Sequence, residues 1–385
     1  MIPLFKVHMP ASVIGPLGKT LASGWVGQGP RVEEFEKKIM SFVGGKYHLA
    51  LNSGTSALHL AYHLSGVGPG TNVVTTPMTC TATNLPLLAL GAEIRCADVH
   101  PDTGLIDEKS AVALVDANTR AVVAVDWGGM PAVTPHFVRA IRAAAPRAAI
   151  VEDAAHAIGA QYRNIHVGAT ADFTAFSFQA IKHLTTGDGG LLTIRDKSVY
   201  RRGKLLRWYG LDRGAAGGGS SYGQLIADAG YKFHMNDIAA TIGLEQLKYL
   251  HDVLVRHRHA ASFYRFQFRE RGIRTITLPP VDKNASPSWW LFTVLCDDRE
   301  RFIRHMTAAG IAVSPVHRRN DEHPCFAAFA RGPLPGVDRF ASRQCAIPCG
   351  WWLTDKTLRY IMSFIEAYDK VTIGSGTHYE ARRGL

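Results

Sequence analysis

A single lysine, Lys182, follows a short apolar stretch in the sequence FSFQAIKHLTTGDGG. A permanently charged ammonium group is costly to hold there, because a charge loses its hydration when it leaves water. An amine in such a place becomes useful when it forms a Schiff base with an aldehyde. Most lone lysines are solvated surface residues, so the covalent interpretation depends on the residues around Lys182.

Asp153 ends the apolar run AAIVED and precedes the small residues AAHAIGA. A carboxylate at a strand end could keep a pyridine nitrogen protonated, which lets such a ring accept electrons from a substrate carbon. The competing interpretation is a helix N-cap. His156 lies three residues further on, and it could either reach a ring hydroxyl or be a core histidine bonded to the backbone.

The stretch NSGTSALHL changes from strand to helix at small residues, which leaves backbone N–H groups free above the turn. Gly54 and Thr55 could therefore bind a phosphate, although an ordinary capped turn has the same pattern. Ser177 alternates with Phe176 and Phe178, so its hydroxyl is expected to point away from their rings and toward the phosphate. A lysine for an aldehyde, an acid for a pyridine nitrogen and a phosphate cradle together predict a pyridoxal 5'-phosphate (PLP) site.

Motifs for other chemistries are missing from the sequence. It contains no GxSxG and no P-loop lysine motif, and its GGG run lacks the preceding strand of a dinucleotide fingerprint. The six cysteines form no CxxC pair and have no clustered ligand spacing. We therefore expect reduced thiols and no metal site.

The elements that must position these residues alternate between strand and helix. Short β-branched runs such as NVVTTP, AEIRCADV and RAVVAVDW are separated by helical patterns over residues 82–90, 108–115 and 136–144. This alternation predicts an α/β fold with a mostly parallel sheet covered on both faces. Ligands of such sheets bind beyond the carboxyl ends of the strands, which is where Asp153 and Gly54 fall.

We predict two domains that pack as one unit. Residues 1–250 form a large domain that begins with an N-terminal arm before a helix at Gly29-Pro30. Residues 251–385 form a small α+β domain, in which WWLFTVLCD and IAVSPVH are predicted strands. The glycine-rich stretch at residues 212–223 is expected to be a loop.

The bulk composition is that of a soluble globular protein, with 385 residues of which 46% are hydrophobic. The formal net charge is +11, but the basic residues are scattered and form no stripe interleaved with aromatic residues, so we expect no nucleic-acid partner. Some of this charge could instead steer phosphate-bearing ligands. No apolar run approaches the ~18–20 residues of a membrane span, and the N-terminus lacks a signal-peptide pattern. We therefore expect a cytoplasmic protein with no membrane partner.

The ordered set of motifs resembles the DegT/DnrJ-type (StrS-like) sugar aminotransferases, which are PLP-dependent enzymes of the aspartate-aminotransferase fold type I. The resemblance extends over residues 24–365. The segments that carry it are GWVGQGPRVEEFE, NSGTSALHLA, GVGPGTNVVTTPMTCTATN, EDAAHAIGA, FSFQAIKHLTTGDGG, GYKFHMND, SWWLFTV and GIAVSPVH. It implies a large domain with a mostly parallel seven-stranded sheet between helices, followed by a small C-terminal α+β domain.

The resemblance also implies a role for each residue of the cofactor site. By it, Lys182 binds the aldehyde of PLP, Asp153 binds the pyridine nitrogen and His156 lies near the ring hydroxyl. The positions that match phosphate-binding residues are Gly54, Thr55 and Ser177. Many relatives stack an aromatic side chain on the cofactor where this sequence has Cys80, so the packing over the ring must differ here.

Further residues are implied for the partner subunit and the substrate. Lys232 in GYKFHMND stands where relatives often have an asparagine that reaches the phosphate of the neighbouring subunit. A lysine there would be a stronger counter-ion, and it implies a homodimer with shared active sites. His317 matches a histidine near the sugar-nucleotide site, and Arg318 and Arg319 could contact a diphosphate.

The activity that the resemblance implies is transfer of an amino group to a keto group of a nucleotide-linked deoxysugar in amino-sugar biosynthesis, with L-glutamate as the family's usual donor. Lys182 would act as the general acid and base. Relatives that dehydrate sugars have lost this lysine, so its presence favours transamination. Two alternatives stay open: a PLP enzyme that acts on a free cyclitol or an aminohydroxybenzoate precursor, and a non-catalytic regulatory relative, which would need neither Lys182 nor Asp153.

Overall fold

The large sheet of the protein has seven strands in the order β1-β9-β8-β5-β4-β2-β3. The structure, a computed structural model, describes residues 1–214, 223–330 and 332–380, so residues 215–222 of the predicted glycine-rich loop lie outside the described part. The strands are β1 (Tyr47–Leu51), β2 (Asn72–Thr75), β3 (Glu93–Cys96), β4 (Thr119–Val125), β5 (Ala149–Asp153), β8 (Phe173–Ser177) and β9 (Gly190–Ile194). Only β9 runs antiparallel to its neighbours in this sheet. The predicted mostly parallel α/β sheet is confirmed.

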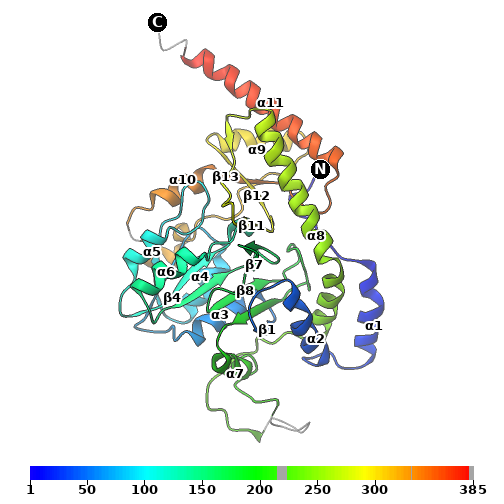
Figure 1. Ribbon diagram of the computed structural model, residues 1–385, viewed down its shortest axis with the longest axis vertical. Helices are drawn as coiled ribbons and strands as arrows, with labels where there is room; N and C mark the ends of the chain where they lie inside the picture. The colour runs from blue at the N-terminus through cyan, green and yellow to red at the C-terminus, as the bar shows by residue number, and fades with distance from the viewer. Residues whose placement is uncertain (215–222, 331, 381–385) are drawn as a thin grey trace.

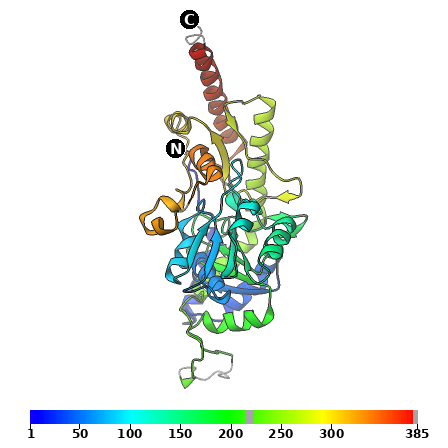
Figure 2. The same ribbon diagram turned by 90° about the vertical axis from the view of Figure 1, so that its left-hand side faces the viewer.

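Helices cover both faces of this sheet (Figures 1 and 2). In β1, Leu49 and Leu51 pack into the cluster that contains α3, whereas Ala50 packs into the cluster that contains α2 and α8. Strands buried on both faces are apolar along their whole length, which is why short β-branched runs identified them. The helices around the sheet are α1 (Ile14–Ala22), α2 (Pro30–Lys38), α3 (Gly54–Leu64), α4 (Thr81–Ala89), α5 (Glu108–Leu114), α6 (Pro135–Ala144) and α7 (Lys197–Leu206).

A smaller sheet lies above the large one in Figure 1 and has the order β10-β12-β13. Its strands and helices are β10 (Ile276–Thr277), β12 (Phe292–Cys296), β13 (Gln344–Ile347), α9 (Arg299–Ala308), α10 (Pro335–Arg343) and α11 (Asp355–Glu380). A third sheet joins β6 (Gln161–Tyr162) and β7 (Ile165–His166) to β11 (Ala285–Ser286). The long helix α8 (Asp237–Glu270) runs beside both larger sheets. Because residue 250 lies inside α8, we propose that the border between the two predicted domains falls within this helix.

Two segments differ from the sequence prediction. The predicted strand IAVSPVH forms only isolated bridges, from Ile311 to Ile2 and from Ser314 to Ala346. Pro315 follows directly and has no N–H to extend the ladder. The predicted N-terminal arm contains helix α1, whose Thr20 hydroxyl is 2.9 Å from the Thr241 hydroxyl of α8. Gly and Pro residues in IGPLGKTLA lower its intrinsic helix propensity, so contacts with α8 stabilise α1 instead.

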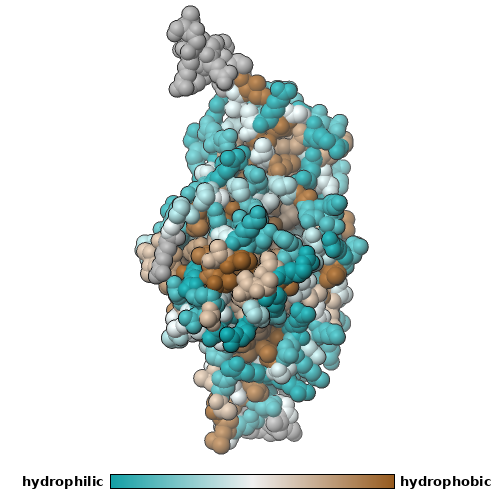
Figure 3. Space-filling model, turned by 60° about the vertical axis from the view of Figure 1, so that its left-hand side comes forward, coloured by the Kyte–Doolittle hydropathy of each residue, from teal (hydrophilic) through white to brown (hydrophobic). Residues whose placement is uncertain are grey.

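Large hydrophobic side chains are exposed near the N-terminal end of α2. Trp25 and Val26 are 56% and 44% exposed, and they line a surface hollow with Trp208 and Arg213. On the face that Figure 3 shows, hydrophobic residues form separate patches among hydrophilic ones. Among the described residues, no helix combines the length and the apolarity that crossing a membrane requires.

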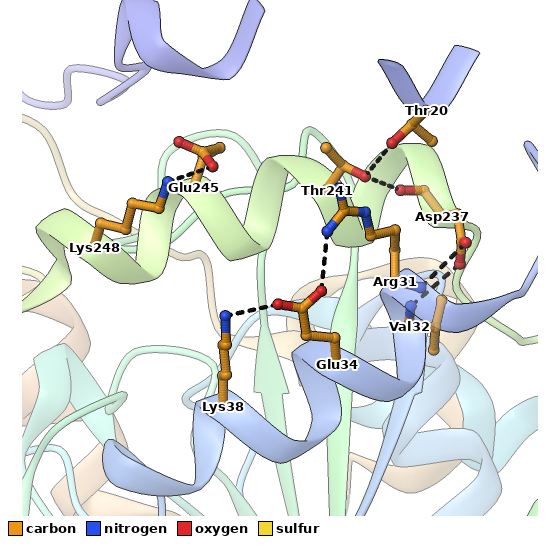
Figure 4. A network of polar contacts seen from close by, with 9 residues as sticks. All are labelled: Thr20, Arg31, Val32, Glu34, Lys38, Asp237, Thr241, Glu245 and Lys248. Atoms are coloured by element: carbon orange, nitrogen blue, oxygen red, sulfur yellow. Dashed lines mark hydrogen bonds and ion pairs between the residues drawn. The ribbon is translucent and has the colours of Figure 1, made fainter. Parts of the chain in front are cut away.

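Asp237, the first residue of α8, fixes the start of α2 (Figure 4). Its side chain is buried and accepts hydrogen bonds from the backbone N–H groups of Gly29 at 2.8 Å, Arg31 at 3.2 Å and Val32 at 3.1 Å. These are N–H groups at the N-terminus of α2, which have no partner inside the helix. One carboxylate thus joins the two helices that cover this face of the sheet.

Replacing Asp237 with alanine is expected to lower the free energy of unfolding by about 2–4 kcal/mol, because three N–H groups, of which that of Val32 is buried, lose their acceptor together. Urea unfolding followed by circular dichroism measures the change. Asp252→Ala, at an exposed position of the same helix, is the matched control and should change little. Equal stability of the two variants would contradict the role of Asp237.

Candidate active site

Four predicted site residues lie at one edge of the large sheet. Asp153 ends β5, and Ser177 ends β8 shortly before a turn in which the N–H of Lys182 donates to the carbonyl of Gln179 at 2.9 Å. Gly54 begins α3 directly after β1 and lies against Ser177. The carboxyl ends of β1, β5 and β8 point the same way, so the edge predicted to bind a ligand carries all of these residues.

The Lys182 side chain is largely covered by protein, and its amine rests on an aromatic face. Its Nζ lies 3.5 Å from the centroid of a Trp290 ring. Burial lowers the pKa of Lys182 to about 7, although the nearby groups of Asp153 and Cys80 favour the charged form. A substantial fraction of this amine is therefore neutral at neutral pH, which is the state that attacks an aldehyde.

Asp153 is a buried acid whose two carboxylate oxygens each accept one hydrogen bond from the protein. It is 5% exposed, and its Oδ2 accepts from the Thr83 hydroxyl at 2.6 Å while Oδ1 accepts from the N–H of Ala155 at 3.1 Å. Burial raises the pKa of Asp153, whereas both hydrogen bonds and the charge of Lys182 act in the opposite direction. A further cation against the carboxylate would stabilise its charged form, which is what a protonated pyridine nitrogen supplies.

Replacing Thr83 with valine is expected to weaken PLP binding about tenfold, because a charge-assisted hydrogen bond to Asp153 is lost while the side-chain volume is kept. Equilibrium titration of the apoprotein with PLP measures the affinity. Thr83→Ser should restore it, and Thr241→Val is the control for removing a buried hydroxyl elsewhere. Wild-type affinity in Thr83→Val would show that Asp153 needs no support from this hydroxyl.

His156 has one ring nitrogen bonded to the backbone, and its other nitrogen is left as a donor. The N–H of Gly128 donates to Nδ1 at 3.4 Å. Burial, followed by the charge of Lys182, moves the pKa of His156 well below its usual range, so the ring is neutral. A neutral ring with Nδ1 as acceptor carries its proton on Nε2. The sequence left a backbone-bonded histidine and a ligand-binding histidine as alternatives, and this geometry is compatible with both at once.

The turn between β1 and α3 forms a small concave cradle. The Ser53 side chain caps α3 by accepting from the N–H of Ser56 at 3.0 Å, and the N–H groups of Gly54 and Thr55 lie in the first turn of the helix. A Cβ atom added to Gly54 would lie 3.0 Å from the Cβ of Ser177, so any larger residue would crowd the cradle. Backbone donors at a helix N-terminus beside a hydroxyl fit a phosphate.

Lys232 lies next to this cradle within the same chain. Its carbonyl accepts from the Asn52 side-chain amide at 3.3 Å, and Asn52 immediately precedes the cradle residues. Lys232 also forms an isolated bridge with Trp208, which lies in the hollow beside Trp25. The position of Lys232 therefore connects the phosphate cradle to the exposed hydrophobic surface.

The three residues predicted to bind substrate differ in their surroundings. His317 packs parallel to His156 at 5.9 Å between ring centroids, and its buried Nε2 has no hydrogen-bond partner among the described residues. Burial lowers the pKa of His317 to about 4. Arg318 is 68% exposed at its side chain and lies 3.6 Å from Glu322. Arg319, also predicted to contact a diphosphate, donates to Asp321 and Asp338 through three of its five N–H groups.

These observations fit PLP. The amine of Lys182 is partly neutral, Asp153 is a buried acid that a cation would stabilise, and Gly54 and Ser177 border a cradle that a side chain would fill. Sequence analysis missed two contributors, Thr83 and Trp290. Both lie in motifs that carry the resemblance, but their roles depend on partners 70 and 109 residues away, which no local pattern reveals.

Comparison with known proteins agrees with this site. The model of the DegT/DnrJ/EryC1/StrS aminotransferase family matches residues 11–366. The crystal structure of the sugar aminotransferase CalS13 from Micromonospora echinospora is 38% identical, covers 95% of this chain and all of its own, and superposes with a TM-score of 0.90. The UDP-4-amino-4,6-dideoxy-N-acetyl-beta-L-altrosamine transaminase of Campylobacter jejuni is 30% identical over 94% of this chain and 96% of its own. The spore coat polysaccharide biosynthesis protein SpsC of Bacillus subtilis is 37% identical over 73% of this chain and 72% of its own.

Proposed function

The chain belongs to the DegT/DnrJ/EryC1/StrS aminotransferase family of PLP-dependent enzymes, and from this premise we propose that it moves an amino group from L-glutamate to a keto group of a nucleotide-linked deoxysugar. The predicted family, fold and cofactor are confirmed. The observation that carries the proposal is the proximity of a partly neutral lysine, Lys182, to a buried acid, Asp153. The amino donor and the sugar acceptor are the parts that we propose.

Lys182 has two tasks in this proposal. Its amine would hold the cofactor, and when free it would act as the base that takes the proton from the donor's Cα and as the acid that gives it back. PLP, when bound, supplies an electron sink that makes this proton acidic. A pKa near 7 suits both directions of proton movement, because such an amine releases and accepts a proton with similar ease.

The other residues of the site bind and orient. The carboxylate of Asp153 would hold the ring nitrogen in its protonated form, and Nε2–H of His156 would be free to donate to the ring hydroxyl. Gly54, Thr55 and Ser177 would hold the phosphate and so orient the ring relative to Lys182. The buried indole of Trp290, on which the amine rests, excludes water from that side of it.

We assign recognition of the sugar nucleotide to His317 and Arg318. We place His317 against the sugar, since its buried Nε2 is available for a hydroxyl or keto oxygen. Arg318 is the exposed guanidinium that we assign to the diphosphate, in place of the paired Arg319. The relative from Campylobacter jejuni is named for a UDP-linked amino sugar, which supports a nucleotide-linked acceptor.

We further propose a cytoplasmic homodimer whose sites are shared. The exposed Trp25 and Val26 lie beside Trp208, and Lys232 connects this surface to the phosphate cradle. Covering these hydrophobic side chains with a second copy would bring Lys232 near the partner's cradle. Light scattering of the purified protein measures the mass, and a monomer at micromolar concentration would contradict this part.

The proposed activity is tested in two steps. L-Glutamate added to the PLP-loaded protein should convert its visible absorbance to that of pyridoxamine phosphate and release 2-oxoglutarate, and an unchanged spectrum would contradict glutamate as donor. A nucleoside diphosphate such as UDP or dTDP should raise the melting temperature. Conversion by glutamate without nucleotide binding would instead support an enzyme for a free cyclitol or aminohydroxybenzoate precursor. Absence of any amino transfer would support a regulatory relative.

A further inference from the structure

A short segment directly before β12 contacts Lys182 and both of its neighbours in the sequence. Nε1–H of Trp290 donates to the carbonyl of Ile181 at 2.9 Å. On the other side of the lysine, Nε2–H of His183 donates to the carbonyl of Ser288 at 3.0 Å. The Lys182 amine itself lies on the Trp290 ring, 3.5 Å from its centroid. Residues 288–290 thus fix the lysine at its backbone and at its reactive end.

This segment is held firmly against the sheet edge. The N–H of Ser288 donates to the carbonyl of Gly129 at 3.1 Å, and its hydroxyl donates to the carbonyl of His156 at 2.7 Å. The carbonyl of Trp289 accepts from Nδ1–H of His257 at 2.9 Å. Trp289 has a φ of 56°, which is rare for a bulky residue and persists only where surrounding contacts impose it. The backbone is strained at Trp289, and this conformation places the next residue, Trp290, against the lysine.

Trp290 has a second active-site neighbour in addition to Lys182. His156 stacks on it with 3.9 Å between ring centroids and 25° between planes, and Phe5 of the N-terminal segment stacks at 5.1 Å. The indole is 4% exposed. An ammonium group on an aromatic face gains most when both are out of water, which is the situation here.

We propose that Trp290 is a positioning residue for the amino transfer, whose ring holds the released Lys182 amine in its protonated form and whose Nε1–H fixes the backbone beside it. This inference rests on the proposed function. A lysine that carries a proton from one carbon to another must be stable with and without its charge. Burial favours the neutral amine, whereas the nearby groups of Asp153 and Cys80 favour the ammonium. The Trp290 face adds a further attraction for the ammonium. The Trp290 ring also stacks on the imidazole of His156 and so fixes the orientation of that imidazole.

The test measures the titration of Lys182 in the full-length protein loaded with pyridoxamine 5'-phosphate, which has no aldehyde and leaves the lysine amine free. Brief acetylation with acetic anhydride over a range of pH, followed by mass spectrometry of the Lys182 peptide, gives its pKa. Trp290→Leu removes the ring face and the N–H, and is expected to lower the pKa of Lys182 by about 0.5–1.5. Trp290→Phe keeps a ring face and should retain more than half of the wild-type effect. Equal titration of Lys182 in Trp290→Leu and the wild type would overturn the proposal.

Trp351 provides a matched control. It contacts another lysine in the same two ways, with Lys6 Nζ 5.3 Å from its ring centroid and Nε1–H donating to the Lys6 carbonyl at 3.1 Å. Trp351→Leu should therefore leave the titration of Lys182 unchanged. A shift as large as that of Trp290→Leu would mean that loss of any such indole loosens the fold.

Fluorinated tryptophan tests the electrostatic effect of the Trp290 ring while nearly keeping its shape. It needs no destabilising mutation. Growth with 5-fluorotryptophan weakens the negative ring face while keeping Nε1–H, so it should lower the pKa of Lys182 in the wild type and leave Trp290→Phe unaffected. The same shift in both proteins, or none in either, would contradict a direct contact.

The kinetic arm uses glutamate with the PLP-loaded protein. Trp290→Leu should slow the single-turnover conversion about tenfold at saturating glutamate, with little change in the concentration needed for half saturation. An unchanged rate would overturn the positioning role. If the wild type fails to react with glutamate but the titration still depends on Trp290, the proposed function fails while the contact stands.

Discussion

Replacing Lys182 with alanine is expected to lower the rate of amino transfer by at least about 10⁴-fold, because the same residue supplies the amine that holds the cofactor and the base that moves the proton. Binding of PLP should persist with reduced affinity, since Asp153 and the cradle at Gly54 remain. Treatment with borohydride should add the cofactor mass to the wild type and leave Lys182→Ala unmodified. Stopped-flow absorbance with L-glutamate measures the remaining rate.

Chemical rescue of Lys182→Ala and a second lysine variant test this role. A small primary amine such as methylamine should restore part of the proton transfer in Lys182→Ala, because the space of the missing side chain lies on the Trp290 face and can hold a cation. Lys248→Ala, in an exposed ion pair with Glu245, should react like the wild type. Borohydride labelling that continues in Lys182→Ala would assign the covalent attachment to a different lysine.

The sequence predicted the large sheet well because its physical signal is local. A strand buried on both faces is mainly apolar, as β4 is, and the helices that precede β4 and β5 begin at the recognisable caps Asp107 and Thr134. Helix α1 gave no such signal, because its glycines and proline disfavour a helix and its packing against α8 stabilises it. The expected strand IAVSPVH had strand composition but lacked a partner along its length.

In the site too, residues with a local sequence signal could be predicted, and residues whose role depends on long-range contacts could not. Lys182, Asp153 and Gly54 could be predicted because each follows a strand in a recognisable pattern, and parallel strands bring such ends together. Thr83 and Trp290 could not, because their contacts join distant segments. Arg319 pairs with Asp338, 19 residues later, as well as with Asp321, and no local pattern shows the contact with Asp338. Charge in a sequence does not reveal which partner neutralises it.

Two buried acids at this sheet edge have different expected roles. Asp126, at the end of β4, is fully buried, and its N–H donates to the carbonyl of Asp153 at 3.0 Å. Burial, followed by repulsion from Glu152, raises the pKa of Asp126 well above its usual range, and its Oδ2 has no partner among the described residues. Burial therefore favours the neutral form of Asp126. Asp153, in contrast, receives two hydrogen bonds and faces Lys182, so it is the acid that a cation converts to a carboxylate.

The pH dependence of stability should reflect the raised pKa of Asp126. Above the pKa of an unfolded aspartate, about 3.9, the unfolded chain loses a proton that the folded chain retains at Asp126. The folded state then binds more protons, so this residue lowers stability as pH rises toward its folded pKa. Asp126→Asn should remove that loss, and its melting temperature relative to the wild type should increase from pH 4 to pH 7. A constant difference would contradict a neutral Asp126.

Replacing Asp153 with asparagine is expected to slow amino transfer by about 10²–10³-fold, because a neutral amide cannot keep the pyridine nitrogen protonated. The substitution preserves size. The amide oxygen can still accept from the N–H of Ala155, and the amide NH₂, which replaces Oδ2, can donate to the Thr83 hydroxyl. Asp126→Asn is the matched control, since burial favours the neutral form of that acid, and its rate should stay near that of the wild type. Single-turnover reaction with glutamate, together with the absorbance of bound PLP, compares the two variants. A similar loss in both would mean that the buried acids act as one group, and that the charge on the ring cannot be assigned to Asp153 alone.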